Sequence, residues 1–179
     1  MDDLTKRERL RRVALLCCHC ARNIAYYREW HDRLAPGEYG EILATIDGNF
    51  LDMSVMEWCK LFSDKRGKHH WRKVVNHPDF EADMLKQLDE RADQFENYID
   101  DMRAYRDKFL AHLDDERTMN IPSMELARKS VTFFYEYLVS FEASNDDLAG
   151  LPKDLTVYYN DCFAKARSFL DCLDLKPSA

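Results

Sequence analysis

The chain of 179 residues is poor in glycine and proline, with five of each. Tight hairpins and other close turns depend on these two residues, so many short β connections are not expected. Residues that favour long helices, such as leucine, alanine, glutamate, lysine and arginine, are plentiful instead. This balance predicts an all-α fold with almost no sheet.

Long hydrophobic runs are missing as well. No apolar segment approaches the roughly 18 residues needed to span a bilayer, and no opening stretch has the pattern of a signal peptide. The six cysteines have no regular spacing, so we expect reduced thiols rather than a disulfide framework. Because this length fits one domain, these absences predict a single helical domain over residues 1–179, located in the cytoplasm and without membrane insertion.

Several common binding motifs are also absent from the sequence. It contains no glycine loop for phosphate, no dinucleotide fingerprint and no serine nucleophile elbow. Cys17, Cys18, His19 and Cys20 look like metal ligands, but a helix places only Cys17 and Cys20 on one face. No second ligand pair with zinc spacing follows them. We therefore expect neither a metal nor a cofactor, and interpret these thiols as core residues.

Charge is distributed unevenly along the chain. The net charge of −7 argues against a protein that coats nucleic acid indiscriminately. Residues 79–101 carry nine acidic and two basic side chains, which equals the whole net charge and is most simply a solvated helix face. Residues 64–77 carry five basic side chains, and Asp64 is their only acidic neighbour. A local basic patch is therefore expected.

The basic patch interleaves cations with an aromatic side chain, a composition suited to phosphate contacts and base stacking. The alternative is a solvated loop in which Trp71 is anchored in the core. The predicted RNA-binding residues are Lys65, Arg66, Lys68, His69, Trp71, Arg72 and Lys73.

Apolar residues recur at helical spacing in several segments. The predicted helices cover residues 5–34, 39–62 with a bend or break at Gly48, 79–112, a segment capped by Ser123, and 154–173, with a short turn at 71–75. Thr5 and Glu8 have the spacing of a capping box at the first start. The architecture expected is an antiparallel helical bundle of about five or six helices with short connections.

The sharpest chemical feature is the pair Arg106 and His112 in the run Tyr-Arg-Asp-Lys-Phe-Leu-Ala-His-Leu-Asp, residues 105–114. Six residues advance a helix by about 600°, so the two side chains lie about 120° apart around the axis and about 9 Å apart along it. They converge only if the helix unwinds near Ala111, or if a second copy contributes its own pair across a two-fold axis.

This run resembles the signature of the HEPN (higher eukaryote and prokaryote nucleotide-binding) family, in which an arginine and a polar residue precede a histidine by a few positions. Together with the tryptophan-containing segment 58–75, it looks most like the abortive-infection AbiU-type branch. The resemblance implies an all-α bundle that dimerises around its signature helices and, in active members, cleaves RNA without a metal. It also implies an antitoxin protein as a possible partner, and a role in prokaryotic defence.

By this resemblance Arg106 and His112 are catalytic, and Asp107 positions the arginine. The chemistry suits them, since RNA supplies its own 2′-hydroxyl nucleophile. Histidine moves protons near neutral pH, and the arginine fork holds two phosphate oxygens as their charge grows. Two alternatives stay open: a HEPN-like module that binds RNA, nucleotide or a partner without cleavage, and a structural module in which Arg106 pairs with a carboxylate while His112 closes the last helical turn.

Overall fold

The computed structural model describes residues 4–33, 40–111, 120–144 and 146–173. Over these residues the chain is helical and contains no strand, which confirms the predicted all-α bundle. The elements in chain order are α1 (Lys6–Arg33), α2 (Glu41–Phe62), η1 (Trp71–Lys73), α3 (Phe80–Leu88), α4 (Ala92–Tyr105), η2 (Arg106–Ala111), α5 (Met124–Tyr137), η3 (Leu138–Glu142) and α6 (Leu155–Cys172). In this part of the chain no helix is long and apolar enough to cross a membrane.

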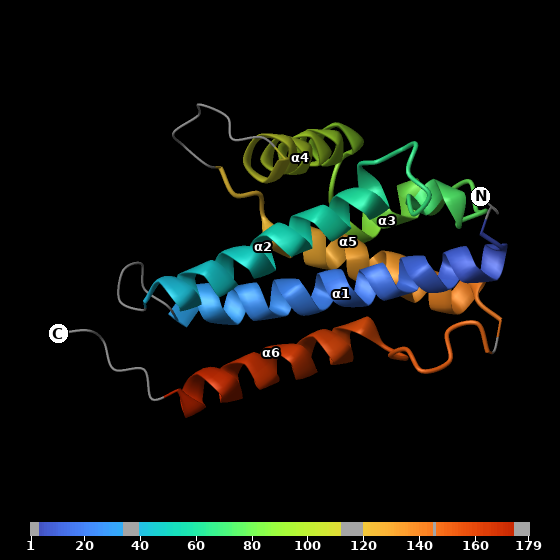
Figure 1. Ribbon diagram of the computed structural model, residues 1–179. Coiled ribbons are helices and arrows are strands. Elements are labelled where there is room, and N and C mark those ends of the chain that lie inside the picture. The colour runs from blue at the N-terminus through green and yellow to red at the C-terminus, as the bar shows by residue number, and fades with distance from the viewer. Residues whose placement is uncertain (1–3, 34–39, 112–119, 145, 174–179) are drawn as a thin grey trace.

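The central element is α1, which packs against α2, α5 and α6 (Figure 1). The helix α2 also contacts α4, so that α2 lies between α1 and α4. The predicted start of α1 is confirmed, because the Thr5 hydroxyl accepts from the Glu8 amide at 3.3 Å and the Thr5 amide donates to the Glu8 carboxylate at 2.9 Å. The N-terminus of α1 is thus capped by its own side chains, and the three neighbouring helices pack against α1.

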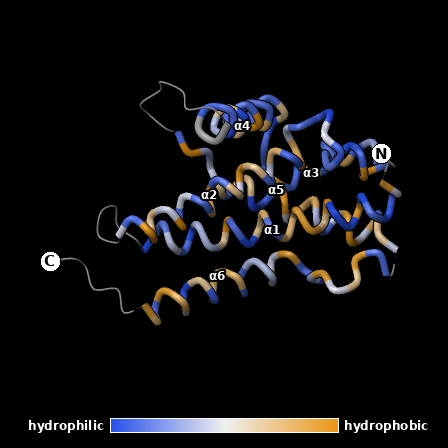
Figure 2. The backbone as a smooth tube through the Cα atoms, in the orientation of Figure 1, coloured by the Kyte–Doolittle hydropathy of each residue, from blue (hydrophilic) through white to orange (hydrophobic). Residues whose placement is uncertain are grey.

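The core is one main cluster of buried apolar side chains, to which all six α-helices contribute. Hydropathy alternates along each helix, as the alternating orange and blue of Figure 2 shows, because one face of each turns inward. At the centre Trp58 is fully buried, and its indole N–H donates to the Ser130 hydroxyl at 2.9 Å. This residue of α2 therefore joins α4 and α5 to the α1–α2 pair, since it also makes edge-to-face contacts with Phe95 and Tyr98 of α4.

The predicted helix over residues 79–112 is wrong as a single element. The first helix of this segment, α3, ends at Leu88, and Asp89 adopts a left-handed conformation with φ of 56°. The Glu90 amide then donates to the Leu85 carbonyl at 3.0 Å, and a new helix begins after Arg91. Aspartate tolerates this conformation better than most residues do, so it closes a helix where a glycine is usual.

One further expectation about helix continuity needs correction. Gly48 neither breaks nor ends α2, which runs through it without interruption. At Arg106 the α-helical pattern changes instead, because η2 is a π-helix with the wider i to i+5 hydrogen-bonding pattern. The motif thus begins where the helix changes form.

Candidate functional site

Arg106 lies at the junction of α4 and η2, and its guanidinium is held by two carboxylates. Its Nε donates to Asp107 Oδ1 at 2.8 Å, and its Nη1 donates to Asp64 Oδ1 at 2.6 Å. These carboxylates raise the pKa of Arg106, so its positive charge is permanent. Among the described residues Nη2 has no hydrogen-bond partner, so two of the three guanidinium nitrogens are held and the third is left for another acceptor, on a side chain that is 18% exposed.

The end of α4 is anchored on α2 by neighbouring residues. The Tyr105 hydroxyl donates to Asp52 Oδ1 at 2.9 Å, and the Cys59 thiol donates to the Met102 carbonyl at 3.6 Å. Tyr105 and Met102 are both buried. Because these contacts fix the last turn of α4, Arg106 projects from a rigid support rather than from a loop.

His112, the second predicted catalytic residue, lies outside the described residues, as do Asp114 and Asp115. Asp107 is exposed and makes the contact with Arg106 that a positioning role requires. The structural alternative predicts that Arg106 pairs with a carboxylate, and the ion pair with Asp64 also fits that interpretation. Geometry at Arg106 therefore agrees with both interpretations.

Sequence reasoning missed Asp64 as a partner of Arg106. Asp64 follows the end of α2 by two positions, and the Gly67 amide donates to its carbonyl at 2.6 Å in a tight turn. A Cβ at position 67 would lie 2.9 Å from that same carbonyl oxygen, so the turn requires glycine. The available signal was that Asp64 is the only acid among the five cations of its segment.

The structure brings the basic loop, residues 64–73, next to Arg106. Residues 63–67 and Arg103 line a shallow surface hollow of about 580 Å³, and Asp64 within it binds Arg106. The predicted RNA-binding segment and the predicted catalytic arginine therefore share one region of the surface.

Three of the predicted RNA-binding residues are engaged within the protein. Lys65 pairs with Glu96 of α4, and Arg72 pairs with Glu81 of α3, each at 2.9 Å. Trp71 is half-buried against Phe80, which is the core-anchored alternative for this residue. Base stacking on Trp71 is therefore not supported. In the described part of the chain Arg66, Lys68 and Lys73 form no ion pair and are exposed.

The cysteines agree with the interpretation as core thiols. Cys17, Cys18 and Cys20 of α1 are buried, as are Cys59 and Cys162, and Cys172 is exposed. Burial raises the pKa of Cys18 to about 11 and of Cys59 to about 12, so both thiols stay protonated at neutral pH. Across the described ranges, no three histidine, cysteine, aspartate or glutamate side chains are grouped to hold a metal ion.

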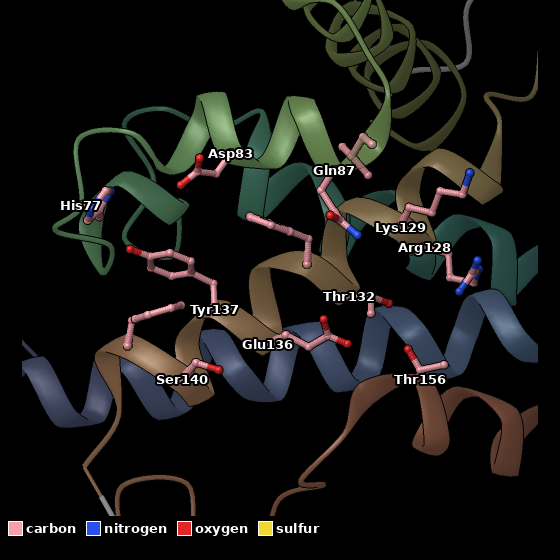
Figure 3. A pocket seen from close by; sticks show the side chains of 13 residues that line it. His77, Asp83, Gln87, Arg128, Lys129, Thr132, Glu136, Tyr137, Ser140 and Thr156 are labelled. Atoms are coloured by element: carbon pink, nitrogen blue, oxygen red, sulfur yellow. The ribbon is translucent and has the colours of Figure 1, made fainter.

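A groove between α3 and α5 has a volume of about 680 Å³ (Figure 3). Asp83 and Gln87 reach it from α3, whereas Arg128, Thr132 and Glu136 reach it from α5. None of the predicted catalytic or RNA-binding residues lines this groove. Its mixed charges give no single ligand class, so the motif region remains the better candidate site.

A buried carboxylate joins α1 to α2. Glu57 is only 4% exposed, accepts from Asn23 Nδ2 at 3.0 Å, and lies 3.5 Å from His19 Nδ1. Burial raises its pKa to about 7, while Asn23 and the charges of Lys60 and Arg22 oppose the shift. Glu57 is therefore near its titration point at neutral pH.

Glu57→Gln is expected to stabilise the protein at pH 8 but not at pH 4.5. The folded state holds the Glu57 proton up to about pH 7, whereas an unfolded glutamate releases it near pH 4.5, so wild-type stability falls between these values. Glutamine removes this loss and keeps an acceptor for Asn23, which gives an advantage of about 1–3 kcal/mol at pH 8. Urea unfolding of both proteins at the two pH values measures it, and an advantage that does not change with pH would contradict the assignment.

Comparisons of the chain with protein-family models, with curated proteins and with solved structures found no match. The family resemblance therefore stays a prediction that depends on the motif around Arg106 and His112.

Proposed function

We propose that this protein is a metal-independent endoribonuclease of the prokaryotic defence or toxin type. The observation that carries the proposal is the state of Arg106, whose guanidinium is held by Asp107 at Nε and by Asp64 at Nη1 and has no hydrogen-bond partner at Nη2 among the described residues. A preoriented arginine loses little freedom when it binds phosphate oxygens, and it acts where negative charge grows in the transition state. The π-helical turn that follows Arg106 supports the proposal, because such turns are frequent at functional sites.

In the proposed reaction the 2′-hydroxyl of a ribose loses its proton to a histidine base and attacks the adjacent phosphorus. The bond from phosphorus to the 5′-oxygen breaks, and that oxygen takes a proton from a histidine acid. The products are a 2′,3′-cyclic phosphate and a 5′-hydroxyl end. His112 is the proposed proton carrier and Arg106 the proposed stabiliser of the phosphorane, with a second copy of the chain completing the site across a two-fold axis.

The test is cleavage of a single-stranded RNA in excess EDTA. We expect cleavage to continue without divalent metal and to leave 2′,3′-cyclic phosphate and 5′-hydroxyl ends, which end-group analysis by mass spectrometry identifies. The Arg106→Ala protein, purified in the same way, measures contaminating nuclease. Loss of cleavage on chelation, or products with 3′-hydroxyl ends, would contradict the mechanism.

The second candidate is an RNA-binding module without catalytic activity. The ion pairs of Arg106 favour it over catalysis, because two carboxylates oppose the close approach of a phosphate to Arg106, while the exposed cations of the basic loop can still bind the RNA backbone. It predicts RNA retention without product formation, and a binding affinity that falls when Lys68 and Arg66 are replaced.

A further inference from the structure

A set of cations that are far apart in sequence gathers around His69 of the basic loop. The helices α1 and α2 run antiparallel, and their contacts pair Tyr26 with Phe50 and His19 with Glu57. In these two pairs, the residue nearer the start of α1 meets the residue nearer the end of α2. Extending the same register beyond the end of α2 brings the start of α1 opposite residues 64–69. Arg12, two turns before His19, is therefore brought to the basic loop.

The surroundings of His69 support this register. Burial lowers the pKa of His69 first, and the positive charges of Arg12, Lys60, Arg9 and Lys68 lower it further. These charges come from α1, from the last turn of α2 and from the loop, so three separate segments meet around one imidazole. We name Arg12, Lys60, Lys68 and His69 the cation surface.

The cations of the cation surface, unlike others in the basic loop, are not neutralised by ion pairs within the described part of the chain. Lys65 and Arg72 are paired with the acidic helices, whereas Arg12, Lys60 and Lys68 form no ion pair with any described residue. Two carboxylates approach from α1 and α2. Glu8 caps the first turn of α1 through Thr5, and Glu57 is buried against Asn23. The hydrogen bonds of Thr5 and the charge of Arg12 lower the pKa of Glu8, whereas burial raises the pKa of Glu57 against the charge of Lys60. Arg12 and Lys60 thus act through charge alone, without an ion pair to either carboxylate, so three lysine and arginine side chains still have room for an anionic partner.

We propose that the cation surface binds the phosphate backbone of the RNA strand and holds that strand beside Arg106. The inference rests on the proposed function and names the surface that receives its substrate. RNA is the partner the geometry favours, since the loop that carries Lys68 and His69 is tied to Arg106 through Asp64. With Trp71 packed against Phe80, contacts here are made to phosphate, so binding is independent of base sequence.

The test measures binding separately from cleavage. Fluorescence anisotropy of a labelled 12-nucleotide DNA strand, which has no 2′-hydroxyl and is not cleaved, reports affinity at several salt concentrations. Neutralising three phosphate contacts gives a slope of log affinity against log salt of about −2 for a single strand. In the variant Arg12→Ala, Lys60→Ala, Lys68→Ala we expect this slope to approach zero and the affinity in about 100 mM salt to fall at least about tenfold.

A control variant removes the same charge elsewhere on the protein. This control is the triple variant Lys129→Ala, Lys153→Ala, Lys165→Ala. The three lysines are exposed and lie on α5, just before α6 and on α6, respectively. Its affinity is expected to stay within about threefold of wild type, because distant surface charges are screened. An equal loss in both triple variants would overturn the inference, since net charge alone would then govern binding.

Cleavage of the matching RNA separates this inference from the proposed function. A wild-type protein that binds the strand through the cation surface but produces no cleavage keeps the inference and rejects the ribonuclease. A protein that cleaves RNA equally well with and without the three cations keeps the ribonuclease and overturns the inference. Binding to anionic phospholipid vesicles in place of the nucleic acid strand would also overturn it.

Discussion

Arg106→Ala is expected to lower the rate of RNA cleavage by about 10²–10³-fold, the usual cost of removing one preorganised group that stabilises transition-state charge. Arg106→Lys keeps the charge but not the planar fork, so it restores only part of the rate. His112→Ala is expected to cost about 10²–10⁴-fold through loss of proton transfer. Single-turnover cleavage of a labelled RNA at saturating protein measures all three.

A purely structural role for Arg106 has a different signature. Asp64→Asn weakens the same ion pair from its other side, so it is expected to lower stability as Arg106→Ala does, yet to change the cleavage rate by less than about tenfold. Arg33→Ala is the matched control, because Arg33 is also held by two carboxylates, Asp171 at 2.8 Å and Glu29 at 3.5 Å, on elements that do not contact Arg106. Equal rate losses in the Arg106→Ala and Asp64→Asn proteins would assign Arg106 to the fold.

Local signals in the sequence predicted most of the helical framework. The capping residue Thr5 bonds to Glu8, only three positions away, and α1 begins directly after it, as predicted. The start predicted at residue 154 also agrees with α6, where the Asp154 side chain accepts from the Val157 amide. The break at Asp89 was missed for a physical reason. Leu88 and Phe95 are both buried and lie seven residues apart, so the apolar stripe continues across the interruption and conceals it.

Nonlocal pairing explains why the site was only partly predictable. Asp64 and Arg106 are 42 positions apart, and a helical pattern gives no information about which loop lies against which helix end. The same limit applies to Lys65 and Arg72, which the sequence predicts as free cations and which the acidic helices neutralise. Composition located the opposite charges in neighbouring segments, but only the packing of α3 and α4 decides which of them meet.

Trp58→Ala is expected to lower the free energy of unfolding by about 3–5 kcal/mol, near the upper range for a single core truncation. The side chain is fully buried, its ring lies 5.0 Å from that of Phe62 and 5.2 Å from that of Tyr98, and its N–H is bonded to Ser130. Its removal leaves a cavity where α2, α4 and α5 meet, and the Ser130 hydroxyl keeps only its hydrogen bond to the Ala127 carbonyl. Urea unfolding followed by far-ultraviolet circular dichroism measures the loss.

Two companion variants separate the contributions of packing and hydrogen bonding at Trp58. Ser130→Ala leaves the ring in place but the buried indole N–H unpaired, which is expected to cost about 1–3 kcal/mol. Trp58→Phe keeps part of the ring, so it remains measurable if the alanine variant does not fold. Val157→Ala, at a side chain 56% exposed on α6, is expected to change stability by less than about 0.5 kcal/mol. A loss below about 1 kcal/mol in both Trp58 variants would mean that this residue does not hold α4 and α5 to the bundle, and the support beneath Arg106 would then rest on Tyr105 and Met102 alone.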